Sequence, residues 1–436
     1  MSEAAYLFSI VEVVSNIVVV GTGYVGLTTG ACLASLGHHV TCADLDARRI
    51  EALNRGEIPI VEADLDRVVA VGVRGGRLHF VVDASAAVAN AEFVYLCVQT
   101  PQRRDGSADL SYVQAAARQL RFVLAPGSIV VNKSTVPVGS TRVVERELGR
   151  HDVSVVSNPE FLREGTAVND FLHPDRIVIG ADDRTAAERV ASLFDGIDAP
   201  VMLTSPATAE TIKYAANAFL ATKISFINAI AAVCEAVGAD VTEVATGMGY
   251  DKRIGPGFLK PGPGWGGSCF PKDTHALIQI AEEAGYDFHL LRGAVEVNNA
   301  QRRRVVRKII AAAGGDVAGK RVAVWGLTFK ANTDDLRDSP AVAVAAALIE
   351  HGAQIVAYDP TVKADLGAIR VVSEPYGACE GAAALAVLTE WDEFRSFDFV
   401  KVAAALANPV VVDCRNLIDR STVVGSGLSY VGIGRG

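Results

Sequence analysis

NIVVVGTGYVGLTTGACLASLGHHVTCAD, residues 16–44, decides the fold of the first part of this chain. An apolar strand-like run is followed by a glycine-rich turn, a helical stretch and a second strand, which is the order of a β-α-β unit. Gly21, Gly23 and Gly26 form G-x-G-x-x-G between the first strand and the helix. Such glycines allow a tight turn, close approach of a pyrophosphate and close packing of helix on strand. The stretch therefore predicts a dinucleotide-binding fold.

An acidic residue at the end of the second strand indicates which dinucleotide is bound. Asp44 stands 18 residues after Gly26, and a carboxylate at about that distance binds ribose hydroxyls. This favours NAD over NADP. Arg49 could contact the adenosine ribose or a 2′-phosphate, or it could be a solvated helix residue, and both interpretations stay open.

The β-α alternation continues along the chain and then starts a second time. Buried strands such as FVYLCV and SIVVN alternate with helical stretches, which predicts a parallel sheet covered on both faces. Ser205 as N-cap, Pro206 at the first helical position and Gly238 at the end frame one long helix. A second strand-turn-helix-strand unit begins at KRVAVWGLTFK, and AALAVLTE and PVVVDCRN look like further strands of its sheet.

We therefore expect an α/β protein with two Rossmann-like doubly wound domains joined by a helical middle domain. The predicted boundaries are an N-terminal extension at 1–15, a dinucleotide-binding domain at 16–203, a helical central domain at 204–312 and a second Rossmann-like domain at 313–436.

Composition excludes several classes of protein. The 436 residues carry a net charge of -9 with no basic stripe, which argues against a nucleic acid partner. The N-terminus lacks the basic region of a secretory signal, and charged or polar residues interrupt every candidate membrane span. We expect a cytoplasmic protein without a membrane partner, and we predict no metal site.

One of the seven cysteines stands out from the others. Cys32, Cys42, Cys97 and Cys414 lie in apolar runs and look like packed thiols. Cys269 stands in GWGGSCFPKD, which has no apolar periodicity to explain it. It is a candidate nucleophile, and the alternative is a structural thiol in a loop.

Polar residues gather in three other places. The stretches 131–141 and 157–165 follow buried strands, at the edge of a sheet where ligands bind. Lys213 and Asn217 are four residues apart on the long helix and share one face. A salt-bridging lysine on a solvated face is the alternative, and the surrounding apolar residues argue against it.

These motifs together carry a family resemblance. From about Asn16 the chain resembles the UDP-glucose 6-dehydrogenase family, within the wider UDP-glucose/GDP-mannose dehydrogenase superfamily. The matching stretches are VVGTGYVGL, CVQTP, KSTVPVGST, NPEFLREG, HPDRIVIG, KYAANAFLATKISFINAIA, CEAVGADVTEVA, RIGPGFLKPGPGWGGSCFPKD and WGLTFKANTDDLRDSP. Gln99 departs from the family, in which a small residue or proline is common at that place.

The resemblance implies catalytic roles. Cys269 would trap the sugar aldehyde as a thiohemiacetal, which is oxidised to a thioester. Lys213, Asn217 and Asp273 would support the oxyanion and a bridging water. Glu160 would act as general base in hydrolysis of the thioester, with Thr135 positioning the water.

Physical chemistry supports this scheme. An aldehyde is a poor hydride donor until a nucleophile makes its carbon tetrahedral, and a thiolate is such a nucleophile. Loss of hydride from the adduct then gives a thioester, which water hydrolyses readily. Developing oxyanions need fixed cationic and amide donors, and a carboxylate can take the proton of the attacking water.

The resemblance also implies two binding sets. The predicted NAD site consists of Gly21, Gly23, Tyr24, Val25, Gly26, Asp44, Arg49, Thr100, Thr135, Glu164 and Arg337. The predicted nucleotide-sugar site consists of Glu160, Phe161, Leu162, Arg163, Glu164, Lys213, Asn217, Arg253, Phe258, Leu259, Lys260, Pro261, Gly262, Gly266 and Lys330. Arg253 would reach the nucleotide sugar of its own or of a neighbouring subunit, and a surface charge is the alternative for the exposed cations. The second β-α-β unit has WGLTFK instead of G-x-G-x-x-G, which favours it as the nucleotide-sugar half.

The resemblance implies oxidation of UDP-glucose to UDP-glucuronate with two NAD reduced per turnover. A GDP-mannose 6-dehydrogenase is the close rival, and UDP-N-acetylmannosamine dehydrogenases rank lower because they usually depart from EFLREG. A non-catalytic NAD-sensing Rossmann protein is the alternative from another class. The helix at 205–237 is the expected interface of a homodimer, although a helix buried within one chain would have the same pattern.

Overall fold

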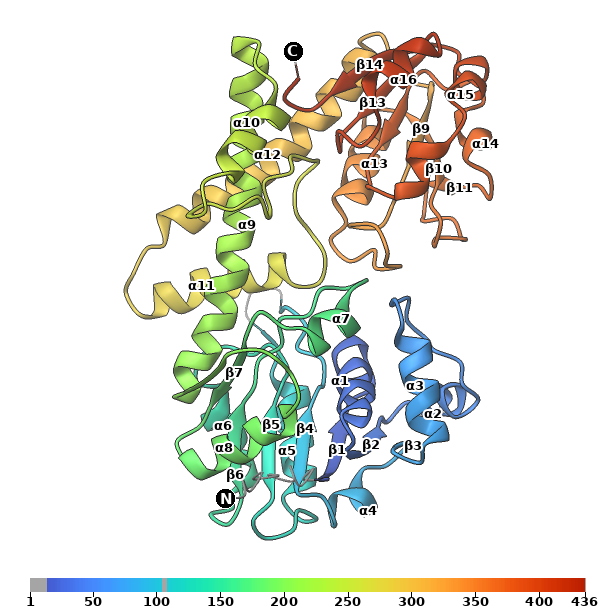
Figure 1. The fold of residues 1–436 in the computed structure, drawn as a ribbon. Coiled ribbons are helices and arrows are strands. Elements are labelled where there is room, and N and C mark those ends of the chain that lie inside the picture. Colours follow the sequence, from blue (N-terminus) through green and yellow to red (C-terminus); the bar gives the residue numbers. More distant parts are fainter. Residues whose placement is uncertain (1–13, 104–107, 436) are drawn as a thin grey trace, which may run out of the picture. The chain divides into compact units, whose positions relative to one another are not determined.

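The computed structural model describes residues 14–103 and 108–435, and these form two compact units. The first unit ends at Lys213 and the second begins at Tyr214. Helix α9 (Pro206–Val237) begins and ends at the predicted residues and runs from the first unit into the second (Figure 1). Residues 1–13 of the predicted extension lie outside the described residues, and the three predicted domain boundaries stay predictions.

The described part of the first unit is built on an eight-stranded sheet with the order β3-β2-β1-β4-β5-β6-β7-β8. The strands are β1 (Asn16–Val20), β2 (His39–Ala43), β3 (Leu78–Val81), β4 (Phe93–Leu96), β5 (Ile129–Asn132), β6 (Ser154–Ser157), β7 (Ile177–Gly180) and β8 (Val201–Thr204). The helices are α1 (Tyr24–Ser35), α2 (Ala47–Asn54), α3 (Leu65–Arg74), α4 (Ser85–Val88), α5 (Ser111–Leu120), α6 (Ser140–Leu148), α7 (Ala167–Leu172) and α8 (Arg184–Ala191), with a 3-10 turn at Ser192–Phe194.

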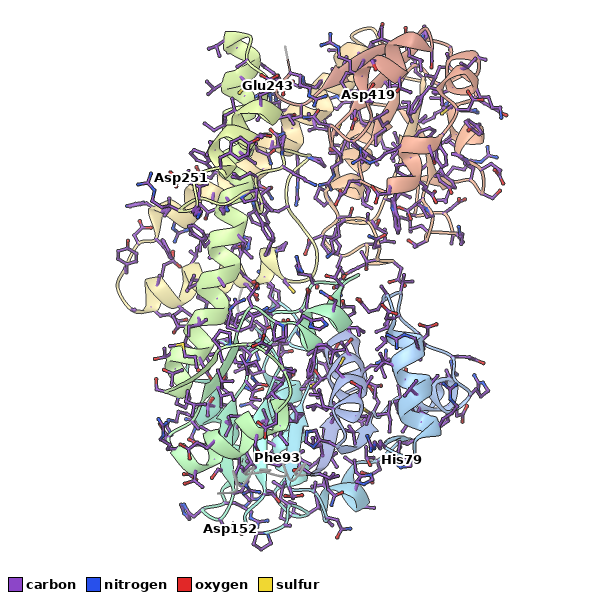
Figure 2. All side chains as sticks on the ribbon, in the orientation of Figure 1. His79, Phe93, Asp152, Glu243, Asp251 and Asp419 are labelled. Carbon is purple, nitrogen blue, oxygen red and sulfur yellow. The ribbon has the colours of Figure 1, made fainter. Side chains whose placement is uncertain are left out.

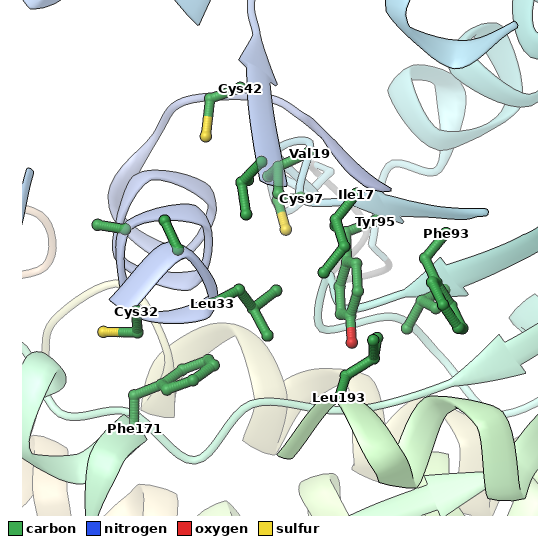
Figure 3. Packing of buried hydrophobic residues seen from close by; sticks show 14 of the residues in the cluster. Ile17, Val19, Cys32, Leu33, Cys42, Phe93, Tyr95, Cys97, Phe171 and Leu193 are labelled. Carbon is green, nitrogen blue, oxygen red and sulfur yellow. The ribbon is translucent and has the colours of Figure 1, made fainter. Parts of the chain in front are cut away.

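Helices cover both faces of this sheet, as the continuous apolar strands predict. Residues of α1, α2, α3, α7 and α8 pack on one face, and residues of α5 and α6 pack on the other. Cys32, Cys42 and Cys97 lie within the first of these cores (Figure 3). Burial raises the pKa of Cys32 and of Cys97 to about 12. The prediction that these cysteines are packed thiols is confirmed.

Two strands, β7 and β8, depart from the expected parallel sheet. Strand β7 pairs antiparallel with β6 through Ser157 and Gly180, whereas β7 and β8 are parallel to each other. The connection from β6 to β7 returns at the same edge of the sheet, and an antiparallel neighbour needs no crossover. The loop at 158–166, with its predicted site residues, follows the carboxyl end of β6, and Asn158 Nδ2 donates to the carbonyl of Val178 in β7.

The second unit contains a smaller sheet, whose six strands in the described residues are all parallel in the order β11-β10-β9-β12-β13-β14. The strands are β9 (Arg321–Trp325), β10 (Gln354–Tyr358), β11 (Arg370–Val371), β12 (Leu385–Val387), β13 (Val410–Asp413) and β14 (Ser429–Gly432). The helices are the rest of α9, then α10 (Val241–Gly249), α11 (Phe270–Glu283), α12 (His289–Ala312), α13 (Pro340–Glu350), α14 (Pro375–Cys379), α15 (Phe399–Ala405) and α16 (Arg420–Gly425), with a 3-10 helix at Asp392–Ser396. The predicted second Rossmann-like fold is confirmed.

Helix α9 corrects one expectation from the sequence. It is long and apolar enough to cross a membrane by length and composition, so charged residues do not interrupt every candidate span. The helix nevertheless carries Glu210 and Lys213, which are buried and bonded to other elements of the first unit. The core helix of a globular domain passes the same test, so the finding is weak evidence for a membrane span.

Candidate active site

The predicted dinucleotide turn has the geometry that its glycines suggest. Gly21 has φ +99°, a backbone conformation that favours glycine, and its N–H donates to the carbonyl of Ala43 at 2.7 Å. A Cβ on Gly26 would lie 1.9 Å from the oxygen of Gly21, so helix α1 packs against the turn too closely for any side chain there. A Cβ on Gly23 would meet nothing within 4 Å.

Asp44 follows β2 and faces this turn. Its Oδ2 accepts from the backbone N–H of Thr22 at 2.8 Å and from the Thr22 hydroxyl at 2.9 Å. Burial alone would raise the pKa of Asp44, but the N–H groups of Asp46 and Thr22 and the guanidinium of Arg49 together lower it. Arg49 therefore lies beside Asp44, at 3.3 Å.

These features fit NAD. The turn leaves open space at Gly23 and lies at the N-terminus of α1, where free N–H groups bind phosphate. Asp44 is ionised and placed for ribose hydroxyls. The apolar side chain of Leu45 is 80% exposed directly after Asp44. Leu45 was not among the predicted cofactor residues, although its place directly after the predicted ribose-binding acid could have marked it.

A buried carboxylate, Glu160, lies in the first unit among residues that follow β5 and β6 and a lysine of α9. Lys213 Nζ contacts Glu160 Oε1 at 2.8 Å, and both side chains are only 5% exposed. The Thr135 hydroxyl donates to Glu160 Oε1 at 3.4 Å, and the Leu162 N–H donates to Oε2 at 2.6 Å. The structure thus brings together the predicted base, its predicted water-positioning threonine and the predicted oxyanion lysine.

Electrostatics keep this buried carboxylate ionised. Burial would raise the pKa of Glu160, but the charge and hydrogen bond of Lys213, the Leu162 N–H and the charge of Lys133 together lower it. Lys133 was missed in the sequence analysis. Its Nζ donates to Asn158 Oδ1 at 3.1 Å, and burial lowers its pKa to about 8. A lysine directly after a buried strand was the available signal.

The loop at 158–166 is held from several sides. The guanidinium of Arg163 pairs with the buried Asp170, so this side chain anchors the loop. The ring of Phe161 lies 3.6 Å below the guanidinium of Arg176 and 5.5 Å from Lys213 Nζ. These contacts occupy two of the residues that the resemblance assigns to the sugar.

A second buried acid, Glu62, connects this loop to the dinucleotide turn. Glu62 accepts from the backbone N–H groups of Gly165 and Ala167, at 2.7 and 2.8 Å, and from the hydroxyl of Tyr24. Burial, followed by the bond to Glu62, raises the pKa of Tyr24. Tyr24 was predicted in the cofactor site, whereas nothing local in the sequence marks Glu62, because its partners are about 100 residues further along the chain.

Cys269 lies in the second unit as the N-cap of α11. It is half-buried, whereas the other six cysteines are buried. Its Sγ lies 3.6 Å from the hydroxyl of Ser268. The N-terminus of a helix favours negative charge, which suits a thiolate.

Asp273 lies one turn further along α11 and is fully buried. It accepts from Asn217 Nδ2 at 2.6 Å and from Lys272 Nζ at 2.5 Å. The structure thus pairs two of the predicted oxyanion residues, Asn217 and Asp273, in the unit that carries Cys269. Lys272 is an additional partner that the resemblance did not assign.

The glycine-rich loop before Cys269 packs tightly on its own unit. A Cβ on Gly266 would lie 2.0 Å from the carbonyl oxygen of Asp338, so that glycine is required by packing. Gly262 lies beside Arg415, whose Nη1 would be 3.1 Å from a Cβ there. Phe258 has φ +62°, which is rare for a side chain of its size. Arg415 was missed, although it stands in PVVVDCRN at the end of a predicted strand.

The predicted cations of the second unit differ in their surroundings. Arg253 is 88% exposed and pairs with Asp251, which Figure 2 labels. Arg337 forms a two-pronged pair with Asp335. Lys330 Nζ lies 5.5 Å from the ring of Phe329. The guanidinium groups of Arg253 and Arg337 were predicted to bind the nucleotide sugar and NAD, respectively. In the structure each forms an ion pair with an aspartate of its own loop.

The fold and the dinucleotide turn define a dinucleotide-binding protein of the Rossmann type, and comparisons with known proteins show that it is an NAD-dependent oxidoreductase and give its family. Models of the UDP-glucose/GDP-mannose dehydrogenase family match three segments: the NAD binding domain at residues 15–198, the central domain at 207–300 and the UDP binding domain at 323–420. The chain belongs to this family.

Individual relatives agree over nearly the whole chain. A UDP-glucose 6-dehydrogenase of Rhizobium meliloti is 49% identical over 96% of this chain and 99% of its own length. UDP-glucose 6-dehydrogenase TuaD of Bacillus subtilis is 45% identical over 96% and 93%. The solved UDP-glucose dehydrogenase of Pyrobaculum islandicum is 37% identical with a TM-score of 0.88, covering 97% of this chain and 98% of that one. A nucleotide-sugar substrate follows from this family and its UDP binding domain.

Proposed function

We propose that this protein oxidises UDP-glucose to UDP-glucuronate, with two NAD reduced for each sugar. The observation that supports this chemistry is the setting of Cys269. Its thiol is half-buried at a helix N-terminus, whereas the other six cysteines of the chain are buried. The relatives named UDP-glucose 6-dehydrogenase support the choice of substrate.

The first oxidation removes two electrons from the sugar alcohol. NAD held at the glycine turn and Asp44 would serve as the hydride acceptor in each of the two oxidations. The alcohol proton leaves through the water held by Asn217 and Asp273, while Lys213 stabilises the developing oxyanion. Their burial favours these roles, because fixed charges and amides act most strongly where bulk water is excluded.

The second oxidation uses the cysteine. The thiolate of Cys269 adds to the aldehyde carbon and forms a tetrahedral thiohemiacetal, which loses a second hydride and becomes a thioester. Glu160 takes the proton of a water placed by Thr135, and that water attacks the thioester carbon. The products are the carboxylate and the free thiol, so the enzyme is restored.

The test follows NADH absorbance with NAD and a panel of nucleotide sugars. We expect two NADH for each UDP-glucose consumed and no acid from Cys269→Ser, with NAD affinity unchanged. Acid production by Cys269→Ser near the wild-type rate would exclude the thioester. Turnover of GDP-mannose in place of UDP-glucose would identify the rival dehydrogenase, and NAD binding without turnover of any sugar would identify a sensor.

We also propose a homodimer through α9 and a cytoplasmic location, where NAD and nucleotide sugars are available. Apolar side chains of α9 at a spacing of seven and four residues lie exposed along one side of the helix, namely Phe219, Phe226, Val233 and Val237. Sedimentation of only monomer at micromolar concentration would reject the dimer. Phe226→Glu should shift a dimer towards monomer, and cell fractionation tests the location.

A further inference from the structure

Side chains of α9 and α12 hold the backbone of the glycine-rich loop at Gly262. The N–H of Gly262 donates to Asn228 Oδ1 at 2.9 Å. The carbonyl of Gly262 accepts from Gln301 Nε2 at 2.8 Å. Both side chains are buried, with exposures of 1% for Asn228 and 4% for Gln301. Both backbone groups of this residue are therefore fixed by helices of the same unit.

The single side-chain amide of Asn298, in α12, bonds both backbone groups of Trp265. Its Oδ1 accepts from the Trp265 N–H at 2.8 Å, and its Nδ2 donates to the Trp265 carbonyl at 3.0 Å. Arg302 Nη2 donates to the same carbonyl at 2.9 Å. Gly264 has φ +116°, and a Cβ there would lie 2.6 Å from Asn298 Oδ1. The amide thus occupies the space that the glycine leaves free.

The side chain of Trp265 links its own hydrogen-bonded backbone to the residue next to Cys269. Its indole N–H donates to the Ser225 hydroxyl at 2.9 Å, and its ring meets Phe270 edge-on with centroids 6.4 Å apart. Phe270 is the first residue of α11 and directly follows Cys269. The position of the thiol is therefore coupled to the backbone of Trp265, and that backbone is bonded to Asn298.

We propose that Asn298 is a positioning residue, which acts through Trp265 to place both Cys269 and the loop predicted to contact the nucleotide sugar. This inference rests on the proposed function. A buried amide that satisfies both backbone groups of one residue fixes its peptide planes, which a glycine-rich loop cannot do alone. Shifts of about 1 Å in reacting groups cost about 100-fold in rate, so a well-held loop matters for turnover.

The experiment compares two neighbouring asparagines of α12 in the full-length protein. Asn298→Asp keeps an acceptor for the Trp265 N–H but loses the donor to the carbonyl, and Asn298→Leu loses both. Asn299 is exposed, and Asn299→Asp is the matched control. We expect kcat/KM for UDP-glucose to fall about 10-fold in Asn298→Asp and about 100-fold in Asn298→Leu, and to change less than about twofold in the control.

Two other readouts separate positioning from a loss of folded protein. The KM for UDP-glucose should rise in both Asn298 variants, whereas the dissociation constant of NAD should stay within about twofold of wild type, because the NAD turn belongs to the other unit. The alkylation rate of the half-buried Cys269 by iodoacetamide should change several-fold. Fewer folded molecules with unchanged KM and unchanged alkylation of the folded fraction would overturn the proposal.

The alkylation rate also keeps the two proposals apart. If wild type oxidises no nucleotide sugar, the proposed function fails, and Asn298 is still tested by the reactivity of Cys269. If wild type is active and Asn298→Asp behaves like Asn299→Asp in KM and in alkylation, the proposed function stands and the positioning role is wrong.

Discussion

The two Rossmann-type units start with the same turn and use it differently. In the first, Gly21 follows β1 with φ +99° and donates to the carbonyl of Ala43. In the second, Gly326 follows β9 with φ +89° and donates to the carbonyl of Tyr358. Both strand pairs have the same register, and an aspartate follows the second strand in each.

The difference lies in what covers the turn. Helix α1 begins at Tyr24, directly after the open position of Gly23, whereas α13 begins only at Pro340, after a long loop. In the second unit, Asp359 is fully buried and accepts from the N–H groups of Leu327 and Thr328 and from the indole of Trp391.

The two aspartates thus differ in how many of their acceptor atoms protein groups already fill. Asp44 keeps an exposed part and can exchange partners with a ribose, but Asp359 has its acceptors filled by protein donors. The aspartate at the second turn is therefore not available to bind a ribose, which agrees with the absence of G-x-G-x-x-G from the sequence there.

The largest expected effect comes from Gly26→Ala in the first turn. The new methyl would lie 1.9 Å from the Gly21 oxygen, so either α1 or the turn must move. We expect the free energy of unfolding to fall by about 3 kcal/mol or more. We also expect NAD binding to fall below the measurable range. Thermal melting and NAD titration check this outcome.

Gly23→Ala is the matched control within the same motif. Its methyl would meet no protein atom within 4 Å, so we expect the melting temperature to change little. NAD affinity should still fall about 10-fold or more, because the backbone could no longer approach the pyrophosphate closely. Wild-type NAD affinity in Gly23→Ala would show that the cofactor does not use this turn.

Exchanging each aspartate for asparagine tests the comparison directly. Asp359→Asn should cost about 2 to 4 kcal/mol of stability, because an amide nitrogen would face buried N–H donors. Asp44→Asn should cost less stability, because the Asp44 side chain is 15% exposed and water can reach it. It should still weaken NAD binding about 10-fold.

Melting temperature and NAD titration of both variants give the answer. We predict that Asp359→Asn mainly lowers the melting temperature and that Asp44→Asn mainly lowers the affinity for NAD. The comparison would be broken if Asp359→Asn weakened NAD binding in fully folded protein, or if Asp44→Asn destabilised the chain as much as Asp359→Asn.

Local patterns in the sequence predicted most of the fold. The ends of α9 were predicted from Ser205, Pro206 and Gly238, and both β-α-β units were predicted from strand and turn residues. These signals are local, since caps, glycine turns and apolar runs act within a few residues. The antiparallel β7 was not predicted, because strand direction depends on how a 19-residue connection packs.

The candidate site could be predicted only in part. Glu160, Lys213 and Thr135, and separately Asn217 and Asp273, lie together as the resemblance implied. Glu62 and Asn298 were missed because their partners are backbone groups far along the chain, which leave no spacing in the sequence. Long-range bonds to backbone can be recognised only once the fold is known.

A pH dependence distinguishes the strand ends of the two units. After β5 the first unit buries a cation, Lys133, whose pKa burial lowers to about 8. At the end of β13 the second unit buries a carboxyl group, Asp413, whose pKa burial raises. A folded pKa below the unfolded value of a lysine means that the unfolded chain binds more protons between the two values.

Stability should therefore rise with pH through this window, from about 8 towards the ordinary lysine pKa of about 10.4, with a slope of up to about 1.4 kcal/mol per pH unit from Lys133. Lys133→Met lacks this titration, so the melting temperature of wild type should gain on that of the variant as the pH rises from 8 to 10. Asp413 cannot produce this rise, because a carboxyl group whose folded pKa is raised contributes stability that is full below its unfolded pKa and is lost as the pH rises through its folded pKa. A constant difference between wild type and Lys133→Met over this range would mean that Lys133 titrates as an ordinary, solvated lysine.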